Sequence, residues 1–458
     1  MSITTINPAT GDVLKSYHYM TDQNLKTTIE ASHNAFLKWK YTTLDERAKI
    51  VKAVGSKLQD YKEKLSQLMT NEMGKLLAQS HDEVDLCSAI CKYTAKNGVV
   101  VLQNEQRDLL GGGKGIITYS PIGVIYGIQP WNYPAYQVMR YAIVNIMAGN
   151  TVLLKHAENV TGTGKLLEEI FLEAGLPENV FRTLVISHDQ SDTVIENEAV
   201  RGVTLTGSSK AGKIIAEKAG AELKKVVLEL GSNDAYIVLD DADIDDAVEK
   251  AVRGRIYNNG ETCIAAKRFV IVEAVYEKFK MAFVEAMKNV TIGNPNDSTV
   301  ELGPIARADL RETLHDQVEE SIKNGATILC GGEMPEGKGF YYPVTVLEHV
   351  KPGQPAYDDE LFGPVASLIK ARNEDDAMRI ANDSRYGLGG GIFSKDEEKA
   401  KKLAEKHFDT GMVFINSFGI ANPDMPFGGV KDSGYGREHG GFGIKEFVNV
   451  KSLILSDN

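Results

Sequence analysis

The chain has 458 residues, 43% of them hydrophobic, which is enough to bury two or three cores, so we expect more than one globular domain. It has 51 Lys and Arg against 63 Asp and Glu, and the net charge of −12 argues against nucleic acid or a membrane surface as the main partner. The four cysteines are too few and too scattered for a disulfide framework, which suits a cytoplasmic protein. No partner residues with zinc spacing accompany them, so we predict no metal.

The first part of the chain is predicted to open with a small hairpin and to continue as helices. INPATGDVL places Pro and Gly between two short apolar pieces, a pattern typical of strand, turn and strand. Apolar residues then recur at three- and four-residue spacing, as half-buried helices require, over residues 22–39, 45–69 and 80–103. The glycine cluster 111–115 lacks the Lys-Ser/Thr pair of a phosphate loop and precedes a β-prone run, so it predicts a hairpin turn.

From residue 149 onward, short apolar runs alternate with amphipathic ones. A first series predicts strands at 151–154, 180–186, 202–205 and 225–230 and helices at 162–174 and 211–219. A second series predicts strands at 236–239, 268–272, 326–329, 344–347 and 366–370 and helices at 243–258, 275–288 and 311–324. Such alternation is typical of parallel sheets covered on both faces, so the predicted fold class is α/β with two domains. The β-prone tail, 442–455, is expected to pair with another strand, in this chain or in a neighbouring subunit.

The stretch 257–268, YNNGETCIAAKR, sets a single cysteine just after a glycine-containing turn. Cys263 could serve as a nucleophile if its surroundings favour the thiolate, or it could be a small apolar residue at the end of a buried helix. Its immediate neighbours do not decide between these interpretations. A base, an oxyanion donor and an electron acceptor elsewhere in the chain would favour the nucleophile.

Two other motifs offer such partners. Asn132 lies between the two prolines of PWNYP, where a fixed amide could donate to a developing oxyanion or could cap the helix that follows. Glu229 ends the apolar strand of LELGS, and parallel sheets place their chemistry at such strand ends. A carboxylate in an apolar setting has a raised pKa that suits a general base, whereas a solvated glutamate would have no such role.

Further motifs are suited to a dinucleotide. Gly207 and Ser208, in LTGSSKAG, would let backbone amides at a helix N-terminus face a pyrophosphate, although the segment is not a GxGxxG fingerprint. Lys155 and Glu158 follow a strand and could bind two ribose hydroxyls, and a carboxylate there disfavours a 2′-phosphate. Taken alone, each of these groups could equally be surface charge or part of a turn.

The combination closely resembles the aldehyde dehydrogenase superfamily. The resemblance runs along the whole chain through INPATG, PWNYP, LTGSSKAG, LELGS, NNGETC, ELFGPV and PFGGVKDSGYGRE, in the family's order and spacing. It implies a Rossmann-like cofactor-binding domain over 1–103 and 122–231 and a second α/β catalytic domain over 232–436. It also implies a small β oligomerisation element made of 104–121 and 437–458, and therefore a homodimer or homotetramer.

The resemblance also implies roles for residues at matching positions. Cys263 becomes the nucleophile, Asn132 the oxyanion donor together with the Cys263 backbone amide, and Glu229 the general base that activates water. Residues at cofactor positions are Trp131, Lys155, Glu158, Gly207 and Ser208, with Glu360 and Phe362 at the nicotinamide ribose and ring. The implied cofactor is NAD, with NADP also possible.

Three positions depart from the usual motifs of the family. His156 stands in a Lys-Pro-Ser/Ala-Glu stretch that here reads KHAE, and Ser232 replaces the second glycine after the base. Glu261 replaces the commoner glutamine two residues before the nucleophile. Its carboxylate would disfavour the thiolate if it faced the site and would be harmless if it pointed to solvent.

The expected substrate is an aldehyde with a carboxylate tail. Tyr136 and Arg140 lie on the helix after PWNYP, which should line the tunnel to Cys263, and an arginine there could pair with a substrate carboxylate or support the helix. The chain is similar to the bacterial succinate semialdehyde dehydrogenase branch, although Tyr257 stands where some members carry a second arginine. A broad-range aliphatic aldehyde dehydrogenase is the main alternative, and a non-catalytic structural relative would be expected to lack Cys263 or Glu229.

Overall fold

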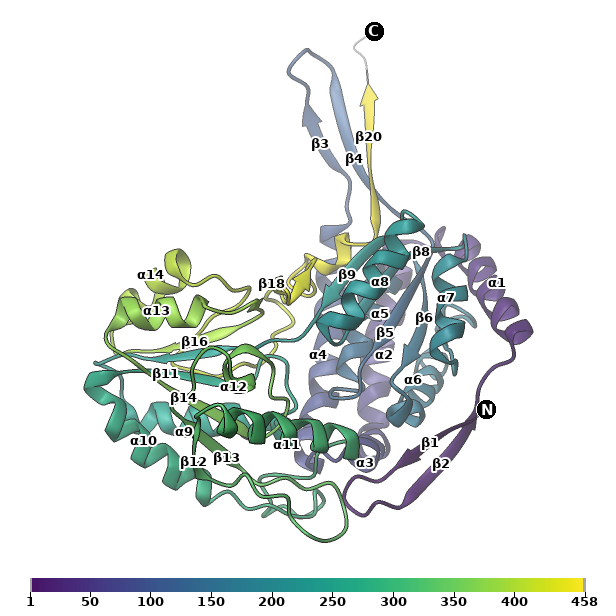
Figure 1. The fold of residues 1–458 in the computed structure, drawn as a ribbon. Helices are drawn as coiled ribbons and strands as arrows, with labels where there is room; N and C mark the ends of the chain where they lie inside the picture. The colour runs from purple at the N-terminus through teal and green to yellow at the C-terminus, as the bar shows by residue number, and fades with distance from the viewer. Residues whose placement is uncertain (1, 456–458) are drawn as a thin grey trace.

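The computed structural model describes residues 2–455 and contains two large parallel sheets, each covered by helices, and a small sheet that projects from the body (Figure 1). The predicted α/β class is therefore confirmed. The residue boundaries given above for the three domains stay a prediction. Within the described residues, no helix is long and apolar enough to cross a bilayer.

The first sheet has six strands, parallel except for the short β19, in the spatial order β19 (Gly434–Tyr435), β9 (Lys225–Glu229), β8 (Val200–Thr206), β5 (Val124–Gln129), β6 (Thr151–His156) and β7 (Phe181–Thr183). Every residue of β6 is buried, as expected for a parallel strand covered on both faces. Val152 and Leu154 pack into one core and Leu153 into the other, because successive side chains point to opposite faces.

Helices from the N-terminal third and from the connections cover this sheet. They are α1 (Asp22–Trp39), α2 (Leu44–Asp60), α3 (Lys62–Met73), α4 (Leu77–Val101), α5 (Tyr136–Ala148), η1 (Glu158–Val160), α6 (Thr161–Glu173), α7 (His188–Glu196) and α8 (Ser209–Ala221). The single helix predicted over 45–69 is wrong, because Tyr61 leaves helical geometry at φ −93°, ψ 4° and separates α2 from α3. Neither Gly nor Pro marks this break, so the apolar pattern runs through it.

The second sheet has seven strands, parallel except for the edge pair β12–β13, in the order β12 (Thr327–Cys330), β13 (Thr345–Glu348), β14 (Val365–Ala371), β11 (Arg268–Val272), β10 (Ala235–Val238), β16 (Gly390–Phe393) and β17 (Phe414–Ile415). Its helices are α9 (Ile244–Ile256), η2 (Tyr257–Gly260), α10 (Glu273–Lys288), α11 (Ala308–Lys323), α12 (Pro355–Asp358), α13 (Glu374–Asn382) and α14 (Glu397–His407). Tyr236 and Ile237 enter two different cores, so this sheet is also covered on both faces.

The projecting sheet joins distant parts of the chain. It has the antiparallel order β20 (Val448–Leu455), β4 (Lys114–Pro121) and β3 (Glu105–Asp108), and it stands away from both large sheets (Figure 1). The expected hairpin turn at 111–115 lies between β3 and β4, with Gly112 and Gly113 at φ 89° and 84°. The tail contains η3 (Gly443–Lys445) and then β20, and β20 pairs with β4 of its own chain, which decides one of the alternatives left open by the sequence.

Two further pairs of short strands complete the fold. β1 (Ser2–Ile6) and β2 (Val13–His18) form the hairpin expected at the start of the described chain, and β15 (Tyr386–Gly387) pairs with β18 (Val430–Lys431). β5, β6, β8 and β9 all end at the same edge of the first sheet. The loop that precedes β11 of the second sheet comes to this edge, and the candidate active site is built there.

Candidate active site

The nucleophile loop, residues 257–267, is held in an unusual backbone conformation. Asn258, Asn259 and Gly260 are three consecutive residues with positive φ, at 55°, 60° and 75°. A Cβ at Gly260 would lie 2.4 Å from the carbonyl carbon of Gly363, so only glycine fits there. Asn259 secures the loop by donating to the carbonyls of Gly74 and Pro304 at 3.0 and 2.9 Å.

Asn132 is brought against this loop. Its amide nitrogen donates to the carbonyl oxygen of Glu261 at 3.0 Å, and its own carbonyl accepts from Asn258 Nδ2 at 2.9 Å. The side chain is nearly fully buried. The side-chain amide of Asn132 is therefore held at the carbonyl two residues before Cys263. It is not the local helix cap that the sequence left open, because the amides of Ala135 and Tyr136 at the start of α5 donate to Glu83 instead.

Cys263 is half-buried and lines a cavity of about 270 Å³ together with Tyr133, Tyr136, Arg253 and Tyr257. Burial raises the pKa of its thiol to about 12. The positive charges of Arg140 and Lys267 oppose this rise in pKa, whereas the carboxylates of Glu360 and Asp234 add to it. A nucleophilic role would therefore depend on the balance of charge around the thiol.

Glu229 ends β9 and is buried, as its place at the end of an apolar strand suggested. Neither of its carboxylate oxygens has a hydrogen-bond partner among the described residues. Burial raises its pKa well above the usual range, the Arg140 guanidinium opposes the rise, and the carboxylate of Glu438 adds to it. An unpartnered carboxyl group with a raised pKa has the properties of a general base.

The structure places Arg140 differently from the sequence expectation. Its side chain is fully buried, pairs with Glu438 and donates to Thr206 Oγ1 at 2.9 Å, and it is not among the residues that line the Cys263 cavity. The guanidinium is paired with Glu438, a distant residue of the GYGRE motif, which favours the alternative that Arg140 supports the helix. Substrate binding by Arg140 stays a prediction. Tyr136 does line the cavity, and its hydroxyl lies 3.0 Å from His439 Nε2.

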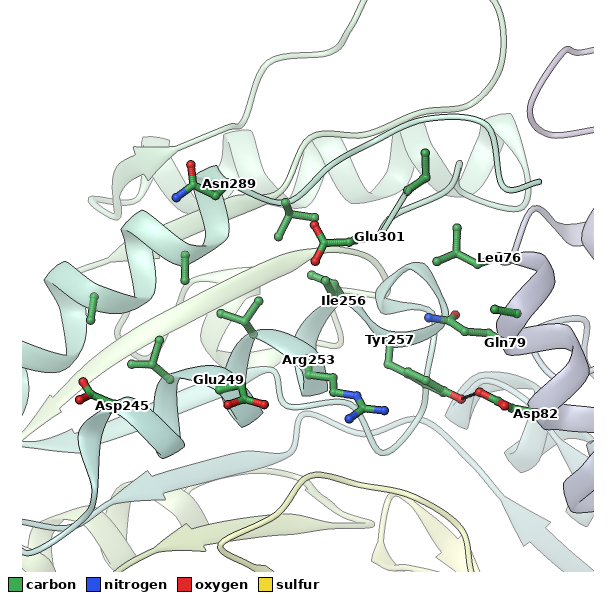
Figure 2. A pocket seen from close by; sticks show the side chains of 17 residues that line it. Leu76, Gln79, Asp82, Asp245, Glu249, Arg253, Ile256, Tyr257, Asn289 and Glu301 are labelled. Atoms are coloured by element: carbon green, nitrogen blue, oxygen red, sulfur yellow. Dashed lines mark hydrogen bonds between the residues drawn. The ribbon is translucent and has the colours of Figure 1, made fainter. Parts of the chain in front are cut away.

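Arg253 is a cavity residue that the sequence analysis missed. It lies exposed in the last turn of α9, and it lines both the Cys263 cavity and a neighbouring groove. Figure 2 shows it in that groove beside Tyr257, whose hydroxyl donates to Asp82 at 3.4 Å. The sequence could have identified Arg253 by its position at the end of the predicted helix that leads into the nucleophile loop. Arg255, two residues later, is buried instead and donates to the carbonyl of Gly260 at 2.6 Å.

Lys155 and Glu158 share a second cavity, of about 510 Å³, with Asn159, His188 and Arg307. Glu158 accepts from the hydroxyl of Tyr19 at 2.8 Å, and the amide of Asn159 has no partner among the described residues. A polar cavity that holds both charges and an unpartnered amide fits a ligand with several hydroxyl groups.

The departure at His156 has a structural explanation. Its ring nitrogens lie 3.2 Å from the carbonyl oxygen of Gln129 and 2.8 Å from that of Pro134. Burial lowers its pKa to about 4, so the ring is neutral at pH 7. His156 therefore ties the end of β6 to the PWNYP loop and leaves the side chain of Glu158 unaffected.

The remaining cofactor candidates lie in two places. Ser208 caps α8 by accepting from the amide of Ala211 at 3.2 Å, and no described atom lies within 4 Å of the position that a Cβ would take at Gly207. The open helix N-terminus suits a phosphate group. Elsewhere, the rings of Trp131 and Phe362 meet edge to face with centroids 5.7 Å apart.

Glu261 neither faces the thiol nor points to solvent. Its side chain is fully buried and accepts from the backbone amide of Ala306 at 3.0 Å. Burial raises its pKa well above the usual range and so favours the uncharged form, which matches in charge the glutamine that Glu261 replaces.

The family model described as "Aldehyde dehydrogenase family" matches residues 1–453. The chain is 41% identical over 449 residues to the succinate semialdehyde dehydrogenase (NAD(P)+) of Escherichia coli K12, covering 98% of this chain and 97% of that protein. It is 39% identical to the succinate-semialdehyde dehydrogenase (NADP(+)) of Mycobacterium leprae, covering 100% of both chains.

Solved structures of similar enzymes match this chain over nearly its full length. Succinic semialdehyde dehydrogenase from Streptococcus pyogenes in complex with NADP+ is 38% identical, with a TM-score of 0.97 over 99% of this chain and 100% of that one. Betaine aldehyde dehydrogenase from Staphylococcus aureus in complex with NAD+ is 29% identical, with a TM-score of 0.95 over 99% and 91% of the two chains. The match of the family model over nearly the whole length, together with these full-length similarities, shows that this chain belongs to the aldehyde dehydrogenase family.

Proposed function

We propose that the protein oxidises succinate semialdehyde to succinate with NAD or NADP, through a thioester on Cys263. The observation that carries the proposal is that Cys263 lines a cavity two residues after the carbonyl that holds the Asn132 amide, while the Arg140 guanidinium lies near both the Cys263 thiol and the unpartnered carboxyl group of Glu229. The substrate is supported by relatives 39–41% identical over the full length that are succinate semialdehyde dehydrogenases.

The chain's own groups account for the chemistry in two stages. The Cys263 thiolate attacks the aldehyde carbon and forms a carbon–sulfur bond, while the Asn132 amide and the Cys263 backbone N–H donate to the resulting alkoxide. A bound nicotinamide dinucleotide supplies the hydride acceptor. Once the carbon has been oxidised, the acyl group remains on Cys263 as a thioester. Glu229 then accepts a proton from the water that hydrolyses it, and the carboxylic acid leaves.

The cofactor would be held at the sites identified above. Lys155 and Glu158 would bind ribose hydroxyls, Gly207 and Ser208 would face the pyrophosphate, and the nicotinamide half would lie near Trp131, Glu360 and Phe362. The unpartnered Asn159 and the open N-terminus of α8 support this fit. Lys155 and Arg307 line the same cavity as Glu158 and Asp309, so a 2′-phosphate would meet positive as well as negative charge, and we propose that both cofactors are accepted.

We further propose Arg253 as the residue that binds the substrate carboxylate. The buried pair with Glu438 occupies Arg140, whereas Arg253 is exposed and lines the same cavity as Cys263. A charge-assisted hydrogen bond to a carboxylate contributes about 1.5–3 kcal/mol, which corresponds to about 10- to 100-fold in kcat/KM. Asp82 lines the same cavity and its negative charge would weaken the attraction of the substrate carboxylate. The preference for an acidic over a neutral aldehyde is therefore expected near the tenfold end of this range.

The test compares succinate semialdehyde with butanal, a neutral aldehyde of the same chain length, as kcat/KM with each cofactor. Arg253→Met should lower kcat/KM for succinate semialdehyde about tenfold and leave butanal nearly unchanged. Lys250→Met, which also removes a cation from α9, is the matched control and should change neither. An equal loss for both aldehydes would contradict substrate binding by Arg253.

The same measurements address the alternative of a broad-range aliphatic aldehyde dehydrogenase. The cavity wall includes Leu86, Ile264 and Phe427, which would also accept a neutral chain. If butanal is oxidised as efficiently as succinate semialdehyde by the unaltered protein, the broad-range function replaces the proposed one. If Cys263→Ala retains turnover, the thioester mechanism itself is wrong.

We also propose a homodimer or homotetramer in the cytoplasm. Seven of the eight residues of β20 are exposed, and Val450 and Ile454 show 59% and 68% of their surface at an edge of the projecting sheet. Exposed apolar edge strands pair with another chain. All four cysteines are free, which suits a reducing compartment and an enzyme that needs its thiol.

A further inference from the structure

Lys267 is a buried cation with no part in the chemistry described above. It is 2% exposed and is the last residue of the nucleophile loop, directly before β11 of the second sheet. Its Nζ lies 2.6 Å from the carbonyl oxygen of Cys263, 3.2 Å from that of Thr262, 2.8 Å from Ser232 Oγ and 3.1 Å from Glu360 Oε1. Burying an ammonium group is unfavourable unless such partners replace its water.

Ser232 gains a role from this arrangement. Its hydroxyl accepts from Lys267 and donates to the carbonyl oxygen of Cys263, so two donors hold the nucleophile's own carbonyl. The usual glycine at this position could make neither bond. The departure from the family motif therefore anchors the nucleophile loop to the segment that follows Glu229.

Glu360 reaches Lys267 because of a neighbouring glycine. A Cβ at Gly231 would lie 2.6 Å from Glu360 Oε2, so a larger residue would displace the carboxylate. The Glu360 carboxylate thus lies against Gly231, just after Glu229, and also pairs with Lys267. Segments of the chain more than a hundred residues apart meet at one ammonium group.

We propose that Lys267 is a positioning residue that couples Glu360 to the nucleophile loop, so that a nicotinamide dinucleotide bound at Glu360 changes the reactivity of the Cys263 thiol. The proposal rests on the proposed function, in which Glu360 holds the nicotinamide ribose. The ammonium group donates its hydrogen bonds to the uncharged oxygens of Thr262, Cys263 and Ser232, and Glu360 Oε1, 3.1 Å away, attracts it by charge without a hydrogen bond. When ribose hydroxyls engage Glu360, this attraction weakens and Lys267 is held more firmly by the three uncharged oxygens.

This change would act on a thiol surrounded by opposing charges. Arg140 and Lys267 favour its ionised form, and Glu360 and Asp234 disfavour it, while the hydroxyls of Tyr133 and Tyr136 face it from the α5 side. Hydrogen bonds from the ribose to Glu360 would withdraw part of the opposing negative charge. Cofactor binding is therefore expected to lower the apparent pKa of the thiol, before any aldehyde is present.

The experiment measures alkylation of Cys263 by iodoacetamide across pH, with and without NAD, from the mass of the peptide that carries it. Cofactor binding is followed separately by quenching of tryptophan fluorescence. In the unaltered protein, NAD should lower the apparent pKa of the thiol by about half to one unit. In Lys267→Met, the apparent pKa without NAD should rise by about one unit and the shift on adding NAD should disappear.

Glu360→Gln removes the negative charge of the Lys267–Glu360 ion pair and leaves the lysine in place. It should lower the apparent thiol pKa in the free protein, weaken NAD binding, and also lose the NAD-dependent shift. Lys250→Met, which removes a half-buried cation of α9, is the control and should behave as the unaltered protein. If Lys267→Met does not fold, Glu360→Gln still decides the question, because a retained NAD-dependent shift there overturns the coupling.

The outcomes separate this proposal from the one on which it rests. NAD binding with an unchanged shift in Lys267→Met would mean that Lys267 only supports the loop, and the coupling would be wrong. Failure of the unaltered protein to bind NAD or NADP would overturn the proposed function and the coupling together.

Discussion

At the scale of single residues, burial raises the pKa of both groups proposed for catalysis. The pKa of Cys263 rises to about 12 and that of Glu229 rises well above its usual range, and Arg140 opposes both shifts. Arg140 itself is balanced by Glu438. The arginine expected to bind the substrate is thus an internal charge shared by the nucleophile and the base.

The first prediction concerns the base. Because only the ionised carboxylate accepts a proton, hydrolysis of the thioester should speed up as pH rises through the raised pKa of Glu229. Glu229→Gln should remove this pH dependence and slow hydrolysis about 10²- to 10⁴-fold. A burst of reduced cofactor and a protein mass increased by the acyl group would be observed on mixing. Glu217→Gln, on α8, is the control, and an unchanged steady-state rate in Glu229→Gln would rule out the role of general base.

At the scale of elements, α5 is oriented by a charge from another helix. Glu83, on α4, accepts from the amides of Ala135 and Tyr136, both at 2.8 Å, at the N-terminus of α5. Glu83 also pairs with Lys75, and neither side chain of the pair is exposed. A carboxylate at a helix N-terminus is attracted to the positive end of the helix dipole and stabilises the helix. This contact places Tyr136 in the cavity wall.

The second prediction tests that contact. Glu83→Ala should lower the free energy of unfolding by about 3–5 kcal/mol, because it leaves the Lys75 ammonium buried without a partner and two amides without an acceptor. The double variant Lys75→Met with Glu83→Gln should lose less free energy of unfolding than the sum of the losses measured for Lys75→Met alone and Glu83→Gln alone. Glu63→Ala, whose side chain is 84% exposed, is the control and should change stability by less than about 0.5 kcal/mol. Midpoints of urea unfolding provide the measurement, and additive losses would argue against the buried pair.

At the scale of the whole molecule, the two covered sheets build the candidate site between them and the third sheet lies apart (Figure 1). β20 pairs with β4 along eight residues but leaves its other edge free within the described chain. Because the side chains of a strand alternate between faces, Val450 and Ile454 lie on the same face. An apolar edge in this position supports the proposed oligomer.

The third prediction concerns that edge. Val450→Asp combined with Ile454→Asp should convert the proposed oligomer into protomers of 50.1 kDa, because charge on the edge strand opposes association. Light scattering coupled to gel filtration measures the mass. Val13→Asp, which places the same charge on an exposed residue of β2, should leave the oligomer intact. A single 50.1 kDa species for the unaltered protein would overturn the proposed assembly.

The sequence by itself determined the fold class, many of the strands and helices and the family, because burial on two faces, helix periodicity and closely spaced motifs are local properties of the chain. It also singled out Cys263, Asn132 and Glu229 as candidates. Only the tertiary structure decided which charges face one another. Glu438 pairs with Arg140, and Arg253 lines the cavity of Cys263. Likewise, Lys267 meets Glu360 across nearly a hundred residues. Such pairings depend on the three-dimensional approach of distant segments, and no local pattern of residues encodes them.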